Sequence, residues 1–271
     1  MATAVEEAKK VEPKPHISPS QLNMFARCPA QYERRYIKGE IIPPGIAMLQ
    51  GSAVHKGAEV NFEQKIESRE DLPEREIIDV AASAFDVNQA AGYQLTPDEE
   101  SIGSKKVLGR ALDQVVAMAA MHARHQAPAY QPIAVEHYCR IELPQASRDI
   151  VAISDLWDDQ DRVIDFKTAK RKSRQGDVDS SVQLTVYAAA FQIEQGHLPR
   201  EVRLDVLVKT ATPTRQVLSG ARTLPDLQAL VNRVNETLRQ IEAGIFPPCA
   251  PDHWMCDPRY CGYYHTCPYV H

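Results

Sequence analysis

The chain has 271 residues, of which 44% are hydrophobic and 25% are charged, and its formal net charge is −5 at pH 7. This length and apolar content suffice for one large domain with a substantial core. The net negative charge excludes a protein that coats DNA nonspecifically, because such binding rests on an excess of lysine and arginine. The sequence also has no internal repeat, Gly-rich phosphate loop or nucleotide triphosphate motif, so it contains no helicase.

The first segment, residues 1–16, is charged, contains proline and has no apolar stretch. We therefore expect a disordered tail, neither a signal peptide nor a membrane anchor, and a cytoplasmic protein. Ordered structure should begin at Ser18, because Ser18, Pro19 and Gln21 occupy the N-cap, N1 and N3 positions of a capping box. The remainder, residues 17–271, is predicted to form a single domain.

Hydrophobic periodicity divides this domain into a helical first half and a strand-rich second half. In the first half, helices are predicted around His55 and over residues 18–36, 73–91 and 99–124. In the second half, helices are predicted over residues 181–195 and 224–243, and strands over residues 133–143, 149–157, 162–168, 202–209 and 215–219. This mixture indicates the α/β class.

Two of the predicted strands flank the polar run 158–161 and should form a β-hairpin. If the turn centres on Gln160, Asp155 and Asp165 lie opposite each other with Cβ atoms about 5 Å apart, and like charges in that position are destabilising. A shared proton or a hard cation such as Mg²⁺ or Mn²⁺ would neutralise them. Lys167 lies two residues beyond Asp165 and shares its face of the strand. A solvated acidic hairpin explains these residues equally well when they are taken alone.

Two further motifs favour a functional interpretation: Gln50-Gly-Ser-Ala-Val-His55 upstream of the hairpin and Gln183-Leu-Thr-Val-Tyr187 downstream of it. A lone histidine or a Gln–Tyr pair on a helical face is otherwise more often structural. Together with Asp155 and Asp165-Phe-Lys167, these motifs resemble the PD-(D/E)XK nuclease superfamily, and in particular its RecB-like members, in which they follow the same order along the chain.

This resemblance implies a restriction-endonuclease-like fold, with a mixed central β-sheet flanked by helices. It also implies a role for each motif residue. Lys167 would position the attacking water and stabilise charge on the phosphate, while Gln183 and Tyr187 would order the site and the DNA strand. Magnesium or manganese would be held by His55, Asp155, Asp165 and the Phe166 carbonyl.

The implied reaction is hydrolysis of phosphodiester bonds in DNA, most simply by an exonuclease acting on single strands or free ends. The resemblance is compatible with a helicase or recombinase partner, and it leaves polarity and pathway open. Two other interpretations remain. One is a DNA-binding or scaffold protein that keeps the fold without catalysis, against which the intact His, Asp, Asp and Lys set argues. The other is a zinc-stabilised interaction domain with exposed hairpin carboxylates.

The C-terminal region holds Cys256, Cys261 and Cys267 within a dozen residues, and tetrahedral thiolate coordination needs a fourth ligand, for which Cys28 is the best candidate. This arrangement resembles the iron-sulfur branch of the same nucleases, including the AddB type and the CRISPR-adaptation nucleases. The resemblance implies a 4Fe-4S cluster that joins the N-terminal helical part to a C-terminal iron-sulfur tail. Four residues separate Cys256 from Cys261 where the family has two, so Cys249 is an alternative to Cys256.

Zinc is the general alternative for a group of four cysteines. Paired disulfides are a poor interpretation, because nothing marks the chain as secreted. Cys139 falls in a predicted strand and is most simply a core thiol.

Two basic runs could contact DNA in spite of the negative net charge. One directly follows Lys167 and the other follows the first predicted helix. Most such runs are solvated loops, so their location carries the argument: a basic stretch beside a metal centre could hold phosphates. The predicted DNA contacts are Arg34, Arg35, Lys170, Arg171, Lys172 and Arg174.

Overall fold

The computed structural model describes residues 15–210 and 212–270. Most of the expected tail, residues 1–14, lies outside the described residues. Its last residue, His16, belongs to a short strand, β1 (His16–Ile17), which pairs in parallel with the strand that begins at Asp149. No helix of the described chain combines the length and the apolar character that crossing a membrane requires.

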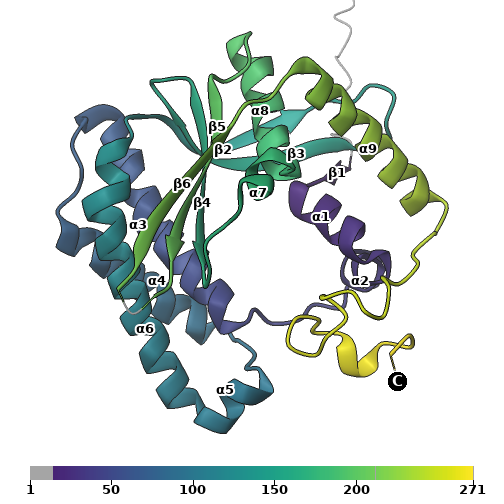
Figure 1. The fold of residues 1–271 in the computed structure, drawn as a ribbon, viewed down its shortest axis with the longest axis horizontal. Coiled ribbons are helices and arrows are strands. Elements are labelled where there is room, and N and C mark those ends of the chain that lie inside the picture. The colour runs from purple at the N-terminus through teal and green to yellow at the C-terminus, as the bar shows by residue number, and fades with distance from the viewer. Residues whose placement is uncertain (1–14, 211, 271) are drawn as a thin grey trace, which may run out of the picture.

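The order of elements places most helices before the sheet, as the sequence predicts (Figure 1). Single π-helical or 3₁₀ turns lie at Glu33–Ile37, His122–Gln126, Ala127–Ala129 and Tyr264–Thr266. The helices are α1 (Pro19–Arg27), α2 (Pro29–Tyr32), α3 (Ile46–Ser68), α4 (Glu74–Ala90), α5 (Pro97–Ile102), α6 (Ser104–Met121), α7 (Gln175–Asp179), α8 (Val182–Gln195) and α9 (Leu224–Glu242). The other strands are β2 (Pro132–Ile141), β3 (Asp149–Asp158), β4 (Arg162–Ala169), β5 (Glu201–Val208) and β6 (Thr214–Gly220).

These strands form one mixed sheet in the order β1-β3-β4-β5-β6, and β2 also pairs with β3. The β2–β3, β3–β4 and β5–β6 pairs are antiparallel, whereas β4 and β5 are parallel. A parallel pair needs a crossover connection, and α7 with α8 provides it. The sheet is therefore mixed and central, as expected from the resemblance.

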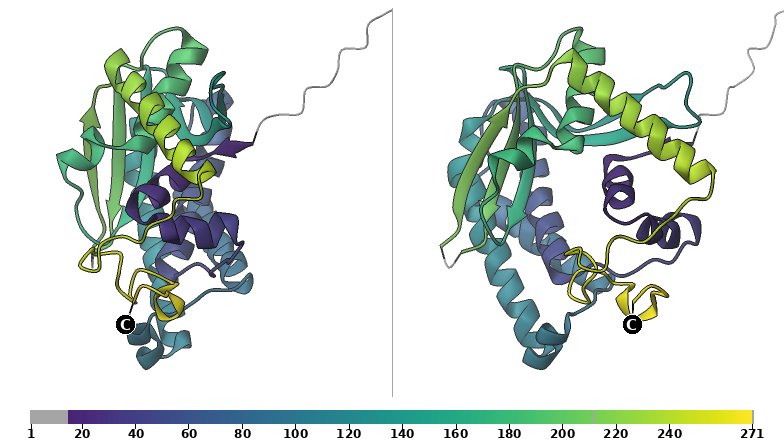
Figure 2. Two further views of the ribbon diagram at one scale, coloured as in Figure 1. Left: turned by 90° about the vertical axis from the view of Figure 1, so that its right-hand side faces the viewer. Right: turned by 45° about the vertical axis from the view of Figure 1, so that its right-hand side comes forward.

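Helices cover both faces of this sheet (Figures 1 and 2). On one face, α3 contacts β2 and β4 and is backed by α4 and α6. On the other, α8 contacts β2 to β5 and is itself covered by α1 and α9. The C-terminal tail passes beside α2, where the Ala30 N–H donates to the Pro247 carbonyl at 3.2 Å.

Local sequence signals explain where helices begin and end. The predicted capping box is confirmed, since the Ser18 side chain accepts from the Gln21 N–H and the Gln21 side chain accepts from the Ser18 N–H. The prediction of one helix over residues 18–36 is wrong, because Cys28 is extended and Pro29 starts a new helix. Proline disfavours helical backbone in the residue before it. The helix predicted over residues 99–124 is likewise broken, at Gly103, whose φ is +91°.

A buried carboxylate, Asp205 on β5, ties the far half of the sheet to the segment before β2. Its oxygens accept hydrogen bonds from Tyr130 at 2.7 Å, Gln126 at 2.9 Å and the Arg215 guanidinium at 2.6 Å. Asp205 is fully buried. The ion pair is satisfied on both sides, so removing one partner would leave an uncompensated charge.

We therefore expect Asp205→Ala to reduce the free energy of unfolding by about 3–5 kcal/mol, because it strands the Arg215 charge in a half-buried position. Chemical denaturation followed by circular dichroism measures this loss. Asp79→Ala is the matched control, since Asp79 is 70% exposed and its ion pair with Arg75 is long, at 3.8 Å. An Asp205 variant as stable as the control would contradict this interpretation of the buried network.

Candidate active site and cysteine cavity

The predicted hairpin is formed by β3 and β4, and its register is the one that the sequence favours. Leu156 pairs with Ile164 and Trp157 with Val163. The same register, continued by one residue, places Asp155 opposite Asp165. At the turn, the Asp158 carboxylate accepts hydrogen bonds from the backbone N–H of Gln160 and Arg162, both at 3.1 Å, which closes the connection. The two carboxylates therefore lie across from each other, just beyond the paired residues of the hairpin.

Helix α3 brings His55 to this pair. The His55 Nδ1 lies 3.7 Å from Asp155 Oδ2, and the same oxygen accepts a hydrogen bond from the Phe166 N–H at 2.8 Å. Burial lowers the pKa of His55, and the Lys167 charge adds to this, against the opposing effects of Asp165 and a hydrogen bond with the Phe166 backbone. The ring of Phe166 stacks on Phe62 of α3, with centroids 5.5 Å apart. This packing holds the Phe166 backbone beside His55 and Asp155.

Glycine in the histidine motif permits this close approach. A Cβ atom added to Gly51 would lie 3.3 Å from Thr168 Oγ1 at the end of β4. That is tighter than ordinary van der Waals contact, so an alanine at this position would require Thr168 or α3 to shift by a few tenths of an ångström. Gly51 therefore allows α3 to pack closely against the end of β4.

Lys167 and Asp165 form an ion pair beside Asp155. The Lys167 ammonium donates to Asp165 Oδ1 at 2.8 Å. Burial raises the pKa of Asp165 to about 6, with repulsion from Asp155 acting in the same direction and Lys167 opposing both. Burial also raises the pKa of Asp155. Burial by itself lowers the pKa of Lys167, but the charges of Asp165 and Asp155 outweigh it and raise this pKa overall.

A third carboxylate, Glu136 on β2, was not predicted. Its backbone has φ of +44°, a strained conformation for a residue other than glycine. Continuing the β2–β3 register places Glu136 opposite Asp155, and ligand atoms of His55, Glu136 and Asp155 all lie within 4.8 Å of one another. Burial and then repulsion from Asp155 and Glu59 raise the pKa of Glu136 to about 7. Asp165 lies outside this close trio.

Gln183 and Tyr187 lie one helical turn apart on α8, as predicted, and the Gln183 amide donates to the Tyr187 hydroxyl at 2.6 Å. Tyr187 is buried, and its pKa is raised by burial and by the charges of Asp165 and Asp155. Tyr187 therefore lies close enough to Asp165 and Asp155 for their charges to affect its pKa. Its amide–hydroxyl pair can orient groups at the site without itself being charged.

A groove of about 1280 Å³ leads to the cluster around His55 and Asp155. The residues that line it come from α3, α4, β2, β3 and β4, and include His55, Glu136, Asp155, Lys167 and Thr168. The basic residues predicted beside it, Lys170, Arg171, Lys172 and Arg174, are exposed on the segment after β4.

The other predicted basic pair is engaged elsewhere. Arg34 binds Glu40 at 2.6 Å, donates to the Thr266 hydroxyl at 2.7 Å and lies over the Tyr263 ring. Arg35 hydrogen-bonds the Tyr263 hydroxyl and lowers its pKa, against the larger raising effect of burial. Both arginines therefore hold the C-terminal tail on the segment after α2, and neither lines the groove.

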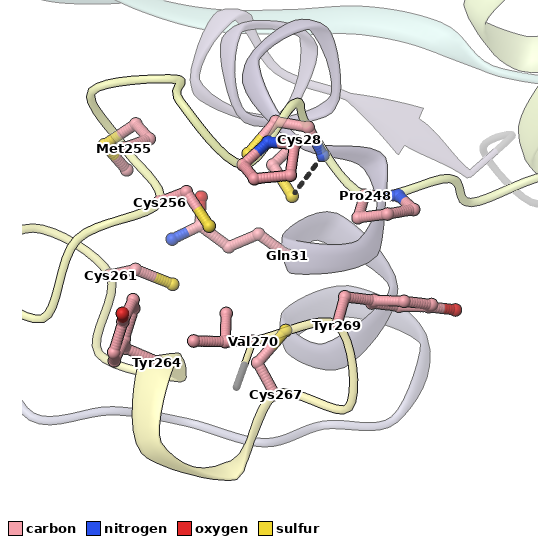
Figure 3. Close-up of a pocket in the computed structure, with 12 residues that line it drawn as sticks. Cys28, Gln31, Pro248, Met255, Cys256, Cys261, Tyr264, Cys267, Tyr269 and Val270 are labelled. Carbon is pink, nitrogen blue, oxygen red and sulfur yellow. Dashed lines mark hydrogen bonds between the residues drawn. The ribbon is translucent and has the colours of Figure 1, made fainter.

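A separate cavity of about 100 Å³ gathers five cysteines (Figure 3). Cys28 stands at the break between α1 and α2, so the proline that interrupts the helix also presents its thiol. The Gln31 amide of α2 extends among the sulfur atoms in Figure 3, and its Oε1 is buried without a hydrogen-bond partner. The cysteines are Cys28, Cys249, Cys256, Cys261 and Cys267.

Electrostatic contacts within the cavity divide these cysteines. Burial raises the pKa of Cys261, and Cys28, Cys267 and Cys256 raise it further, although a backbone hydrogen bond opposes them. Burial raises the pKa of Cys249 to about 12, with contributions from Cys28 and Cys256 only. Cys249 thus lies at one side, with its N–H donating to Cys28 Sγ at 3.4 Å. Cys139 lies elsewhere, buried in β2 as predicted.

A comparison with known protein families shows which family the chain matches. The model of the PD-(D/E)XK nuclease superfamily matches residues 16–268.

This chain belongs to the PD-(D/E)XK nuclease superfamily.

Among solved structures, a candidate exonuclease from Eubacterium rectale aligns with a TM-score of 0.58 and 13% identity, covering 100% of this chain and 96% of that one, which shows a shared fold. The protein SSO0001 aligns with 15% identity over 95% of this chain and 88% of its own, and its TM-score of 0.42 is too low to add to the fold assignment. No curated protein matches the chain.

Nucleases of this superfamily use divalent metal ions, and the geometry of this member fits one. The donors are carboxylate oxygens and one imidazole nitrogen, which suit magnesium or manganese. Three close carboxylates with raised pKa values mark a site that lacks positive charge. The hairpin, His55, Lys167, Gln183 and Tyr187 are brought together as the sequence predicts.

In the metal-free nuclease, the ionised carboxylates should oppose folding. Because the pKa of folded Asp165 is raised to about 6, this residue stabilises the fold while it is protonated, and that contribution is lost as pH rises through 6. We expect Asp165→Asn to flatten the fall in unfolding free energy between about pH 4 and pH 6, measured by urea denaturation in chelator. Asp113→Asn, at an exposed position of α6, is the control. Parallel pH profiles for wild type and Asp165→Asn would contradict the expectation.

Proposed function

We propose that this nuclease is a magnesium- or manganese-dependent deoxyribonuclease that hydrolyses DNA, as an exonuclease on single strands or free ends. The observation that carries the proposal is the meeting of Asp155, Asp165 and Lys167 with His55 at the open edge of the β3–β4 hairpin. An acidic hairpin exposed to solvent would not raise the pKa of Asp165 to about 6, so the interpretation as a plain surface feature loses its support.

The residues divide the work of hydrolysis between them. His55, Asp155, Asp165 and the Phe166 carbonyl are the proposed metal ligands, and Glu136 is close enough to join them or to accept a proton. A cation bound there would acidify a water and stabilise charge on the scissile phosphate. Lys167 keeps its positive charge, so it can orient the water and stabilise negative charge on the phosphate. Gln183 and Tyr187 would orient the DNA strand.

Metal dependence and the hairpin residues are tested together. We expect cleavage of a labelled single strand to require Mg²⁺ or Mn²⁺ and to fall at least about 100-fold in Asp155→Ala, Asp165→Ala and Lys167→Ala, because each removes charge stabilisation of the transition state. Circular dichroism should show an intact fold. Asp161→Ala, at the exposed hairpin turn, should keep activity. Undiminished cleavage by Asp165→Ala would overturn the assignment.

We further propose that the cysteine cavity holds a 4Fe-4S cluster on Cys28, Cys256, Cys261 and Cys267. Its lining supports a group larger than a single ion. A zinc ion with Zn–S bonds of about 2.3 Å brings its sulfurs to roughly 3.8 Å from one another. Among the described residues, no three of the cavity sulfurs lie within 4.8 Å of one another. Cys28, Cys256 and Cys267 all raise the pKa of Cys261, which supports these four as one group. Cys249, which hydrogen-bonds Cys28 and Cys256, is the alternative to Cys256.

The proposed role of the cluster is structural. Phosphodiester hydrolysis moves no electrons, and the cavity cysteines do not line the catalytic groove. Cys28 and Cys267 lie at opposite ends of the chain, so a cluster there would close a long loop and stabilise the fold. A cytoplasmic location stays a prediction, consistent with six cysteines that form no disulfide.

The ligand assignment predicts which cysteines the cluster needs. In protein purified without oxygen, Cys28→Ser, Cys256→Ser, Cys261→Ser and Cys267→Ser should each lose iron and the absorbance near 400 nm. Cys249→Ser and Cys139→Ser should keep both, because Cys249 contacts only one side of the group and Cys139 lies in the core. A cluster that survives Cys256→Ser but not Cys249→Ser would reverse the choice between them, and zinc in place of iron would contradict the cluster.

A further inference from the structure

A half-buried lysine at the end of β5 lies outside every motif discussed so far. Lys209 directly follows the last residue of β5, and its N–H donates to the Ala169 carbonyl at 2.7 Å, which extends the parallel pairing with β4. Its ammonium donates to Gln50 Oε1 at 3.0 Å. Gln50 is the residue before Gly51 on α3, so the ammonium reaches from β5 to the first residue of the histidine motif.

The orientation of Gln50 is fixed. This side chain is 5% exposed, and its amide nitrogen donates to the Ala111 carbonyl at 3.1 Å and to Gln114 Oε1 at 2.8 Å. Both N–H groups of the Gln50 amide therefore donate to acceptors on α6, and its oxygen is left to accept from Lys209. Such support from a second helix holds the ammonium in one place.

Lys209 has no anionic partner among the residues that the structure describes. No carboxylate there lies within 4.0 Å of its ammonium, and its one hydrogen-bond partner is a neutral amide. Burial, and to a smaller extent the charge of Lys170, lower the pKa of Lys209 to about 8. Two ammonium groups held near each other without a carboxylate form a site that lacks an anion.

The position of Lys209 relates this site to the groove. Gly51 and Thr168 both line the groove and lie close to each other. Lys209 hydrogen-bonds the neighbour of each, with its side chain to Gln50 and with its backbone N–H to Ala169. On β4, Ala169 lies two residues beyond Lys167, a distance of about 6.6 Å along a strand. Neither Lys209 nor Lys170 lines the groove itself, so the two lysines lie beside it, next to Gly51 and Thr168.

We propose that Lys209 and Lys170 form a phosphate subsite beside the catalytic groove, which binds a backbone phosphate of the DNA away from the scissile one. The inference rests on the proposed nuclease function and names a substrate contact within it. An ammonium has three donors, so Lys209 can keep its hydrogen bond to Gln50 and still donate twice to phosphate oxygens. Lys170 is exposed and supplies the second positive charge from the solvent side.

The test measures binding of a short fluorescent single strand by anisotropy, across a series of salt concentrations, with Asp165→Ala present in every protein so that the strand stays intact. Lys209→Met should weaken binding about tenfold at low salt. It should also reduce the slope of log affinity against log salt by about 0.7, the value for one phosphate contact on a single strand. Lys209→Arg should keep both, and Lys105→Met, at an exposed position of α6, is the charge-matched control.

Stability separates this role from a structural one. Lys209→Met leaves the buried Gln50 Oε1 without its donor, so its melting temperature should fall somewhat in any case. Lys209→Gln removes the charge but keeps a donor for that oxygen, so it should lose the affinity and the salt slope while its melting temperature stays near that of the wild type. A single methylphosphonate scanned along the strand should weaken wild-type binding at one position, and this effect should disappear in Lys209→Met.

Two results would overturn the inference, and they differ from failure of the nuclease itself. If the wild-type enzyme cleaves DNA while Lys209→Met keeps the wild-type affinity and salt slope, the subsite is wrong and the nuclease proposal stands. If Lys209→Gln keeps the wild-type affinity and salt slope while Lys209→Met loses affinity and melting temperature together, the loss is structural. A wild-type protein that neither binds nor cleaves DNA would remove the nuclease proposal and this inference with it.

Discussion

The burial of neighbouring carboxylates is the constraint on which the rest of the active site depends. Asp155 and Asp165 are opposed across a hairpin, Glu136 approaches from the next strand, and the pKa values of all three are raised. One ammonium, that of Lys167, cannot neutralise three carboxylates. The fold keeps them together because strand pairing fixes the backbone, and a divalent cation supplies the missing charge.

Rigid packing around the hairpin holds this unfavourable arrangement in place. Phe166 separates Asp165 from Lys167 in the sequence, and its ring is stacked under Phe62 of α3. The backbone of β4 therefore cannot relax when the carboxylates ionise. Glu136 has a strained φ of +44°. Such strain persists only where the surrounding structure holds the residue in place, so Glu136 is also fixed by the packing around it. The buried Asp205 network stabilises the neighbouring strand at some distance from the repulsion.

Features that depend on local chemistry could be predicted from the sequence, and those that depend on tertiary register could not. The hairpin follows from alternation around a polar turn, and the capping box at Ser18 from residue spacing. Glu136 was missed because only the pairing of β2 with β3 and a positive φ bring it to the site. Lys209 belongs to no motif, and only the tertiary fold brings it to Gln50 on α3, with which it forms a hydrogen bond. The break at Cys28 was readable from Pro29, but helical periodicity on both sides concealed it.

The most direct test of the account is a crystal structure of the protein with Mn²⁺, in which anomalous scattering locates the ion independently of any assay. The account predicts a manganese peak within coordination distance of His55, Asp155, Asp165 and the Phe166 carbonyl, with Lys167 beside it. Manganese bound elsewhere on the protein, with Asp155 and Asp165 paired only with Lys167 or with each other, would contradict the claim that these carboxylates are held together for a cation.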